Sequence, residues 1–323
     1  MVSAIDIPIV DLNQFLAGDP AGTEATARAF ADAFEGTGFA VITGHGVSEE
    51  LATETYAALT AFFEQPFAAK DVYTPPEQAK GRGYLPLGIE SVAKTLTGET
   101  PPDLCEALVF AGPHRPANDP LNIWPAYPED LTNLVKAWTK QMVTLNHHLS
   151  RLSALALDLP EDFFDAAYAD PSLTLRFVNY PDQEVEPAPG QLRYGAHHDY
   201  GALTILRQDA APGGLQIMDH DGVWKEAPVI PESFIVNVGD LMARWTNNRW
   251  QSTLHRVSNP PRNLTGSTRR LSMVAFTGPH EDWEVSCLPS CQSDALPAQF
   301  EPVKCGEYIL SKIRASMELE ATH

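Results

Sequence analysis

The stretch GAHHDYGALT, residues Gly195–Thr204, carries a His-x-Asp pair within a part of the chain that is rich in short apolar runs. If this stretch is a β-strand, side chains two residues apart point to the same face. His197 and Asp199 could then bind one metal ion together, while His198 would point away from it. The spacing therefore predicts two ligands of a metal site.

A third ligand is available further along the chain, at His255 in the sequence STLHRV. Two imidazoles and one carboxylate form the facial triad of non-haem Fe(II) sites, which leaves metal positions open for oxygen and a cosubstrate. Catalytic zinc sites use the same donor types, but the helical His-Glu-x-x-His spacing is absent and no Glu stands beside His197 as a general base. Each piece is common by chance, and only their combination favours iron.

Further motifs occur in the order typical of one enzyme family. They are IPIVDL (7–12), GFAVI (38–42), GHGV (44–47), the region 194–206, GGLQI (213–217), NVGD (237–240), TNN (246–248) and HRV (255–257). Over nearly its whole length, the chain therefore resembles the isopenicillin N synthase-like 2-oxoglutarate/Fe(II)-dependent dioxygenases. The resemblance implies a mainly β fold with flanking helices, a double-stranded β-helix or jelly-roll barrel whose mouth holds the iron.

The same resemblance assigns roles to individual residues. The two histidines and the aspartate named above match the iron ligands of the family. Arg270 and Ser272 match an Arg-x-Ser pair that holds the distal carboxylate of 2-oxoglutarate, and Tyr180 matches a tyrosine that assists there. A guanidinium suits this task because its planar fork pairs with a carboxylate through charge-assisted hydrogen bonds. Strand alternation separates Arg270 from its neighbour Arg269, which would face away.

We expect one catalytic unit over residues 1–323, although the length alone would allow about two domains. It would comprise an N-terminal dioxygenase region (1–120), an Fe(II)/2-oxoglutarate jelly-roll core (170–285) and a C-terminal helix (303–319). Periodicity predicts mainly helices before about residue 160 and mainly short strands from about residue 173 onward. The helices are expected at 24–35, from Ser48 to before Pro66, and at 129–157, and the strands at 39–42, 203–206, 214–218, 234–238 and 271–276.

Composition limits the partners of the protein. With 22 Lys and Arg against 42 Asp and Glu, the formal net charge is −20, which opposes attachment to nucleic acid or to acidic membranes. No stretch approaches the ~20 apolar residues that span a bilayer. The four cysteines lack a Cys-x-x-Cys spacing and the N-terminus lacks a signal-peptide pattern, so we expect free thiols and a cytoplasmic location. The oligomeric state stays open.

The resemblance implies an oxidoreductase that uses Fe(II), O2 and 2-oxoglutarate as cosubstrate. It would oxidise, and most commonly hydroxylate, an unactivated C–H bond of a small organic metabolite, with release of succinate and CO2. One alternative is an isopenicillin N synthase-like oxidase that uses no 2-oxoglutarate and cyclises or desaturates its substrate. Another, of a different class, is a non-enzymatic metal-binding barrel.

Four residues are candidates for substrate contacts. If the strand that carries the metal ligands is regular, Arg193 shares a face with His197 and could enter the site, although an outward or loop position is equally compatible with the sequence. Tyr200, Phe276 and Tyr84 are further candidates, and Phe276 could instead belong to the core.

Overall fold

The computed structural model describes residues 4–76, 81–98, 100–115, 122–183 and 185–321. Within these residues the β-strands form a large sheet, a small sheet and a two-stranded ladder. The large sheet, in spatial order, contains β1 (Ile9–Asp11), β2 (Phe39–Thr43), β10 (Phe234–Val238), β7 (Leu203–Gln208), β12 (Arg270–Gly278), β5 (Ser172–Tyr180), β4 (Glu106–Ala111) and β3 (Gly83–Leu85). The small sheet contains β6 (Tyr194–His197), β11 (His255–Val257), β8 (Leu215–Met218) and β9 (Trp224–Glu226), and the ladder joins β13 (Glu284–Val285) to β14 (Val303–Lys304).

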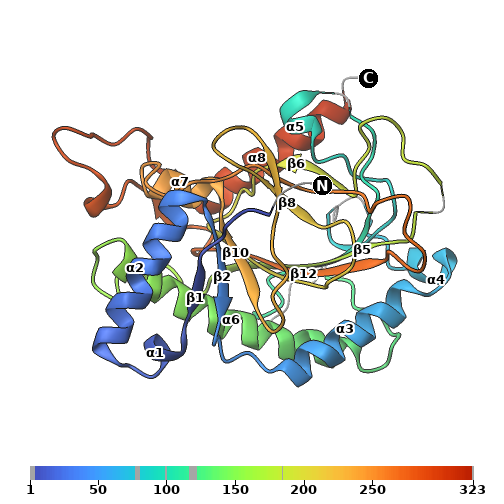
Figure 1. Cartoon of the computed structure of the whole chain (residues 1–323), viewed down its shortest axis with the longest axis horizontal. Helices are drawn as coiled ribbons and strands as arrows, with labels where there is room; N and C mark the ends of the chain where they lie inside the picture. The colour runs from blue at the N-terminus through green and yellow to red at the C-terminus, as the bar shows by residue number, and fades with distance from the viewer. Residues whose placement is uncertain (1–3, 77–80, 99, 116–121, 184, 322–323) are drawn as a thin grey trace.

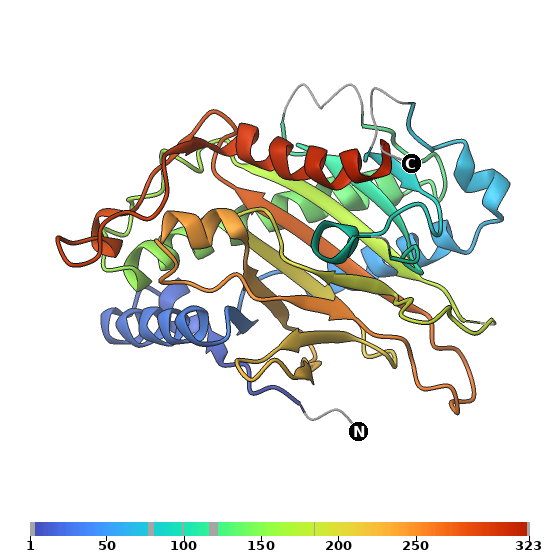
Figure 2. The ribbon, with the colours of Figure 1, turned by 90° about the horizontal axis from the view of Figure 1, so that it is seen from above.

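Helices flank the sheets. They are α1 (Asn13–Leu16), α2 (Pro20–Gly36), α3 (Glu49–Phe63), α4 (Phe67–Asp71), α5 (Lys94–Thr97), α6 (Leu131–Ala156), α7 (Asp240–Trp245) and α8 (Cys305–Ala321), with a 3-10 turn at Pro289–Cys291. Figure 1 shows α3 and α6 on one side of β12 and β5, and β6 and β8 of the small sheet on the other side. Figure 2 shows α8, in red, well away from α2, in blue. None of the helices in the described part of the chain is long and apolar enough to cross a membrane.

The two faces of the large sheet differ in composition, and β12 shows this clearly. Its sequence RLSMVAFTG alternates, so that Leu271, Met273 and Ala275 join the main hydrophobic core with residues of α2, α3 and α6. The alternate residues, which begin with Arg270 and Ser272, point to the other face. Because residues of both sheets share the two smaller hydrophobic clusters, that other face is the inside of the barrel. This arrangement confirms the predicted jelly-roll with flanking helices.

Local signals explain where the helices begin. The Ser48 side chain accepts a hydrogen bond from the Leu51 amide at 3.2 Å, and Glu49 and Glu50 occupy the first turn of α3, as the sequence predicted. Helix α2 begins four residues before its predicted start, because Asp19 accepts a hydrogen bond from the Gly22 amide and Pro20 suits the first helical position.

Candidate metal centre

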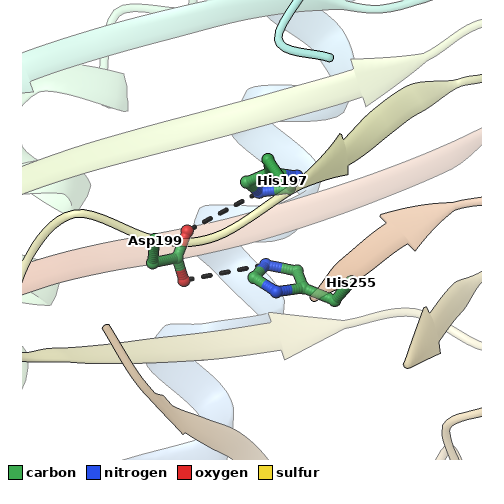
Figure 3. Close-up of side chains that lie close together, drawn as sticks. All are labelled: His197, Asp199 and His255. Carbon is green, nitrogen blue, oxygen red and sulfur yellow. Dashed lines mark ion pairs between the residues drawn. The ribbon is translucent and has the colours of Figure 1, made fainter. Parts of the chain in front are cut away.

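Three side chains predicted as metal ligands lie together inside the barrel (Figure 3). His197 ends β6, Asp199 follows it, and His255 begins β11, the strand that pairs with β6. Nε2 of His197 lies 3.6 Å from Oδ1 of Asp199, and Nε2 of His255 lies 3.7 Å from Oδ2. One ligand atom from each residue lies within 4.8 Å of the others, and among the described residues no other group of three His, Cys, Asp or Glu side chains does so.

Hydrogen bonds orient both imidazoles toward the same point. Nδ1 of His197 lies 2.9 Å from the carbonyl oxygen of Gly195, and Nδ1 of His255 lies 3.0 Å from that of Thr253. A carbonyl oxygen can only accept a hydrogen bond, so each Nδ1 carries the proton. In the neutral imidazole, Nε2 then presents its lone pair, which is the arrangement usual for metal-binding histidines.

The carboxylate of Asp199 is held by the opposite sheet. Its Oδ2 accepts hydrogen bonds from Oγ1 of Thr204 at 2.6 Å and from Nδ2 of Asn237 at 2.7 Å. Thr204 on β7 and Asn237 on β10 are direct partners across the large sheet. The large sheet thus fixes one oxygen of a ligand carried by the small sheet, and Oδ1 stays available for a metal.

The protonation states also suit a metal. Burial lowers the pKa of His255 to about 4, with a further contribution from His197. Burial alone would raise the pKa of Asp199, but the two imidazoles beside it keep that pKa well below its usual range. His255 is therefore neutral and Asp199 charged at neutral pH, which are the forms that bind metal. With two imidazole nitrogens and one carboxylate oxygen, the donor set fits Fe(II).

His198 points away from these ligands, as the strand spacing predicted. Its Nδ1 lies 3.0 Å from the carbonyl oxygen of Ser252. The pairing of β6 with β11 is nevertheless irregular, because His255 lies opposite His197 while Val257 lies opposite Tyr194. Three residues of β11 (255–257) thus span four of β6 (194–197), which is a β-bulge, and bulges redirect side chains next to active sites.

The bulge overturns the premise of the Arg193 prediction, which required a regular strand. It places Tyr194 on the same side as His197, with ring centroids 4.9 Å apart. Arg193 is instead fully buried, and its guanidinium donates hydrogen bonds to the carbonyl oxygens of Pro212, Gly213 and Thr268. These contacts tie two loops to the barrel, and Cζ of Arg193 lies 6.0 Å from the ring centroid of Tyr180, so Arg193 braces the barrel next to the tyrosine of the predicted cosubstrate anchor.

Tyr84 also lies away from the metal ligands, contrary to the prediction of a substrate contact. Its ring packs against Phe62 of α3 in the main core, on the outer face of the large sheet. Its hydroxyl donates a hydrogen bond to Oε2 of Glu106, which also accepts one from Nζ of Lys70 at 2.7 Å. Burial and the Glu106 carboxylate raise the pKa of Tyr84, so the phenol stays protonated as a donor.

The buried ion pair between Lys70 and Glu106 allows a prediction about stability. We expect Lys70→Met to lower the free energy of unfolding by about 3–5 kcal/mol, since it leaves a buried carboxylate without its cation. Urea denaturation measures this loss. The double variant Lys70→Met/Glu106→Gln should recover much of it, because no charge then stays buried. A single variant within about 1 kcal/mol of the wild type would contradict the expectation.

Phe276 and Tyr200 have different surroundings. Phe276 lies opposite Thr204 across the β12–β7 ladder, on the inner face of the sheet, and Thr204 contacts the metal-site carboxylate. Phe276 is therefore next to the candidate metal centre. Nζ of Lys312, a residue of α8, lies 5.9 Å from the ring centroid of Tyr200, so the Tyr200 side chain faces α8.

The predicted cosubstrate anchor is assembled on the same inner face. The guanidinium of Arg270 is almost fully buried and donates hydrogen bonds to Oγ of Ser272 and to Oε1 of Gln208. Tyr180 is the direct partner of Arg270 across β5 and β12, and its ring centroid lies 5.6 Å from Cζ of Arg270. Arg269 faces the other way, toward α3, where it bonds Oε1 of Glu64 at 2.6 Å.

Several residues of this site were not predicted as site residues. Tyr194 is brought in by the bulge, for which the sequence holds no clear signal. Asn237 could have been found, because it is the one polar residue of the otherwise apolar β10, whereas Thr204 and Gln208 lie in β7, where three of the six residues are polar. In the sequence, Asn237 belongs to the family motif NVGD.

Comparisons with known proteins agree with this geometry. A model of the 2OG-Fe(II) oxygenase superfamily matches residues 169–279, and a model described as the N-terminal part of non-haem dioxygenases in morphine synthesis matches residues 7–127. The chain is 30% identical to a 2-oxoglutarate-Fe(II) type oxidoreductase of Aspergillus fumigatus, over 96% of this chain and 93% of that protein. It is 31% identical to a homoarginine-6-hydroxylase of Oryza sativa subsp. japonica, over 87% of this chain and 86% of that protein.

A solved structure of an α-ketoglutarate complex is also similar to this chain. A full-length protein of Neurospora crassa, crystallised in complex with α-ketoglutarate and thymine, matches with a TM-score of 0.85 and 28% sequence identity. The match covers 99% of this chain and all of that one.

Proposed function

This chain belongs to the 2-oxoglutarate/Fe(II) oxygenase superfamily and is an Fe(II)- and 2-oxoglutarate-dependent dioxygenase, and we propose that His197, Asp199 and His255 are its iron ligands. We further propose that it hydroxylates an unactivated C–H bond of a small organic molecule. The observation that supports this assignment most strongly is the joint position of three metal-binding atoms and a buried arginine on one inner surface of the barrel.

The positions of Thr204 and Gln208 along β7 support a cosubstrate that reaches from the metal ligands to Arg270. Thr204 contacts Asp199, and Gln208 contacts Arg270. Both side chains point inward from the same strand, four residues apart, which corresponds to about 13 Å between their Cα atoms. A five-carbon dicarboxylate, together with the inward reach of the arginine side chain, is long enough to bridge this interval.

Each residue then has a defined task. Arg270 donates hydrogen bonds to the distal carboxylate and Ser272 contributes its hydroxyl, while Gln208 keeps the guanidinium in place. Burial raises the pKa of Tyr180, so its phenol stays protonated and can donate as well. Fe(II) with O2 supplies the oxidation, in which the keto acid yields succinate and CO2 and one oxygen atom passes to the substrate. The protein positions the target C–H bond beside the metal.

The nature of the relatives supports a small-molecule substrate. One acts on homoarginine according to its name, and another was crystallised with thymine. We accordingly propose a small polar metabolite as the substrate.

The first test is an anaerobic titration of the Fe(II)-loaded protein with 2-oxoglutarate. We expect the visible metal-to-ligand charge-transfer band of an iron-chelated keto acid to appear, and oxygen uptake in air to require added 2-oxoglutarate. Oxygen uptake without 2-oxoglutarate would instead favour an oxidase that takes all its electrons from substrate. Iron binding that is indifferent to the keto acid, without oxygen uptake, would favour a non-catalytic barrel.

A further inference from the structure

A second charged pair lies inside the barrel, at Arg176 and Glu90. Arg176 belongs to β5 and points inward, because it alternates in phase with Val178 and Tyr180 of the inner cluster. Glu90 comes from the segment between β3 and α5. The pair is bidentate, with Nη1 of Arg176 donating to Oε1 of Glu90 at 3.0 Å and Nη2 donating to Oε2. Neither residue was predicted to belong to the site.

This pair is close to the candidate metal centre. Cζ of Arg176 lies 5.4 Å from the ring centroid of Tyr194, and the Tyr194 ring lies 4.9 Å from the ring of the metal ligand His197. A single aromatic ring therefore separates the guanidinium from a metal ligand. The β-bulge that places Tyr194 on this side is what creates the connection.

The pair is charged and only partly covered. Burial opposes charge on Arg176, but the carboxylate of Glu90 raises the pKa of the guanidinium well above its usual value. The side chain of Arg176 is 12% exposed, whereas that of Glu90 is 32% exposed, so the pair opens toward solvent on the Glu90 side. Glu90 receives two of the five N–H groups that a guanidinium carries.

A structural tether is the alternative explanation, but the same segment is already tied down independently. Asp103 accepts hydrogen bonds from the amide of Gly195 at 2.8 Å and from the amide of Val92 at 2.9 Å. Buried ion pairs are also poor devices for stability, since desolvation offsets most of their attraction. A pair of this kind, one aromatic ring away from the candidate metal centre, is better explained by recognition.

We propose that Arg176 and Glu90 recognise the substrate, with the guanidinium donating to an acceptor oxygen and the carboxylate accepting from a donor nitrogen of the same molecule. This inference rests on the proposed function and names its substrate class. The pair carries no net charge, and the chain carries a net charge of −20, so a substrate without net charge fits better than an anion. A zwitterionic amino acid meets these requirements, and so does the C(=O)–N–H edge of a lactam or imide.

The experiment uses the Fe(II)-loaded enzyme with 2-oxoglutarate and three sets of probes. They are α-amino acids including homoarginine, lactams and imides including thymine and hydantoin, and nitrogen-free monocarboxylic acids of matched size. Succinate formation by NMR reports which probes stimulate turnover. We expect stimulation from one of the first two sets and little from the third. Equal or better stimulation by the nitrogen-free acids, or no stimulation by either nitrogen-containing set, would overturn the substrate class.

Variants then test the two residues with the best stimulating probe. Arg176→Met should lower kcat/KM by about 100-fold, because a buried charged partner is lost. The midpoint of the anaerobic 2-oxoglutarate titration should change less than about threefold. Glu90→Gln distinguishes the amino acids from the lactams and imides, since the amide oxygen of the introduced glutamine still accepts a hydrogen bond from a neutral N–H. It should lower kcat/KM about 30-fold for an ammonium group and only about threefold for an imide.

Arg207 provides a matched control. It forms a bidentate pair with Glu49, with Nη1 donating to Oε1 at 2.9 Å, on the outer face of the same sheet. Arg207→Met should affect stability without changing kcat/KM for the probe. If Arg176→Met does not fold, Arg176→Lys keeps the charge, loses the bidentate fork and should still lower kcat/KM about tenfold.

Two further outcomes would overturn the proposal. One is an unchanged kcat/KM in the Arg176 variants, and the other is a parallel loss of 2-oxoglutarate binding, which would mark the pair as a tether of the barrel. Failure of the proposed function is distinguishable from both, because the wild-type enzyme would then lack the charge-transfer band.

Discussion

Asp199→Ala is expected to reduce Fe(II) affinity by more than about 100-fold and to abolish turnover. Loss of a partner that merely orients a ligand already costs about 10–100-fold in metal affinity, and here the ligand itself is removed. The substitution also leaves Thr204 and Asn237 without the oxygen to which they donate. Iron content after dialysis and an anaerobic Fe(II) titration measure the effect, and circular dichroism verifies the fold.

His198→Ala is the matched control for this variant. His198 is the neighbour of Asp199 in the chain, but its ring bonds the carbonyl oxygen of Ser252 on the other side of the strand. Its removal should leave iron retention unchanged. Asn237→Ala should fall between the two, with a loss of about 10–100-fold. Iron retention in Asp199→Ala together with iron loss in His198→Ala would mean that the strand register is wrong by one residue.

Much of this arrangement could be predicted from local pattern. Strand alternation correctly separated His197 from His198 and Arg270 from Arg269. The prediction of Ser48 as the N-terminal cap of α3 was also confirmed, because the cap and the acidic first turn are signals that act within a few residues. Such features depend on chain neighbours alone.

The errors arise where distant segments meet. The faces of Arg193 and Tyr194 depend on one extra residue in β6 relative to β11, and that count is set by pairing between strands about 60 residues apart. Tyr84 was predicted as a substrate contact but lies on the outer face, and the three residues of β3 are too few to show by alternation which face Tyr84 takes. Arg176 was not predicted because nothing near it in the sequence indicates that Glu90 and Tyr194 lie beside it in the fold.

Arg270→Ala is expected to weaken 2-oxoglutarate binding by about 100-fold or more. Truncation of one partner of a buried, hydrogen-bonded charge pair costs about 2–5 kcal/mol, and every 1.4 kcal/mol is a factor of ten in affinity. Arg270→Lys should lose about tenfold, since the ammonium keeps the charge but not the planar fork. The charge-transfer band of the Fe(II)-loaded protein, titrated anaerobically, gives both dissociation constants.

A variant of the adjacent Arg269 shows whether 2-oxoglutarate binding depends on the charge at the site or on any charge carried by β12. Arg269→Met removes a guanidinium one residue away, whose contacts are Glu64, the carbonyl oxygen of Thr60 and Asn179 on the outer face. Its 2-oxoglutarate affinity should stay within about twofold of the wild type, because side chains one residue apart on a strand face opposite sides. Comparable weakening in both variants would assign the effect to the fold of β12, and unaltered binding in Arg270→Ala would remove Arg270 from the cosubstrate site. A loss confined to Arg270, with iron content unchanged, is the result that the buried guanidinium and its inward position lead us to expect.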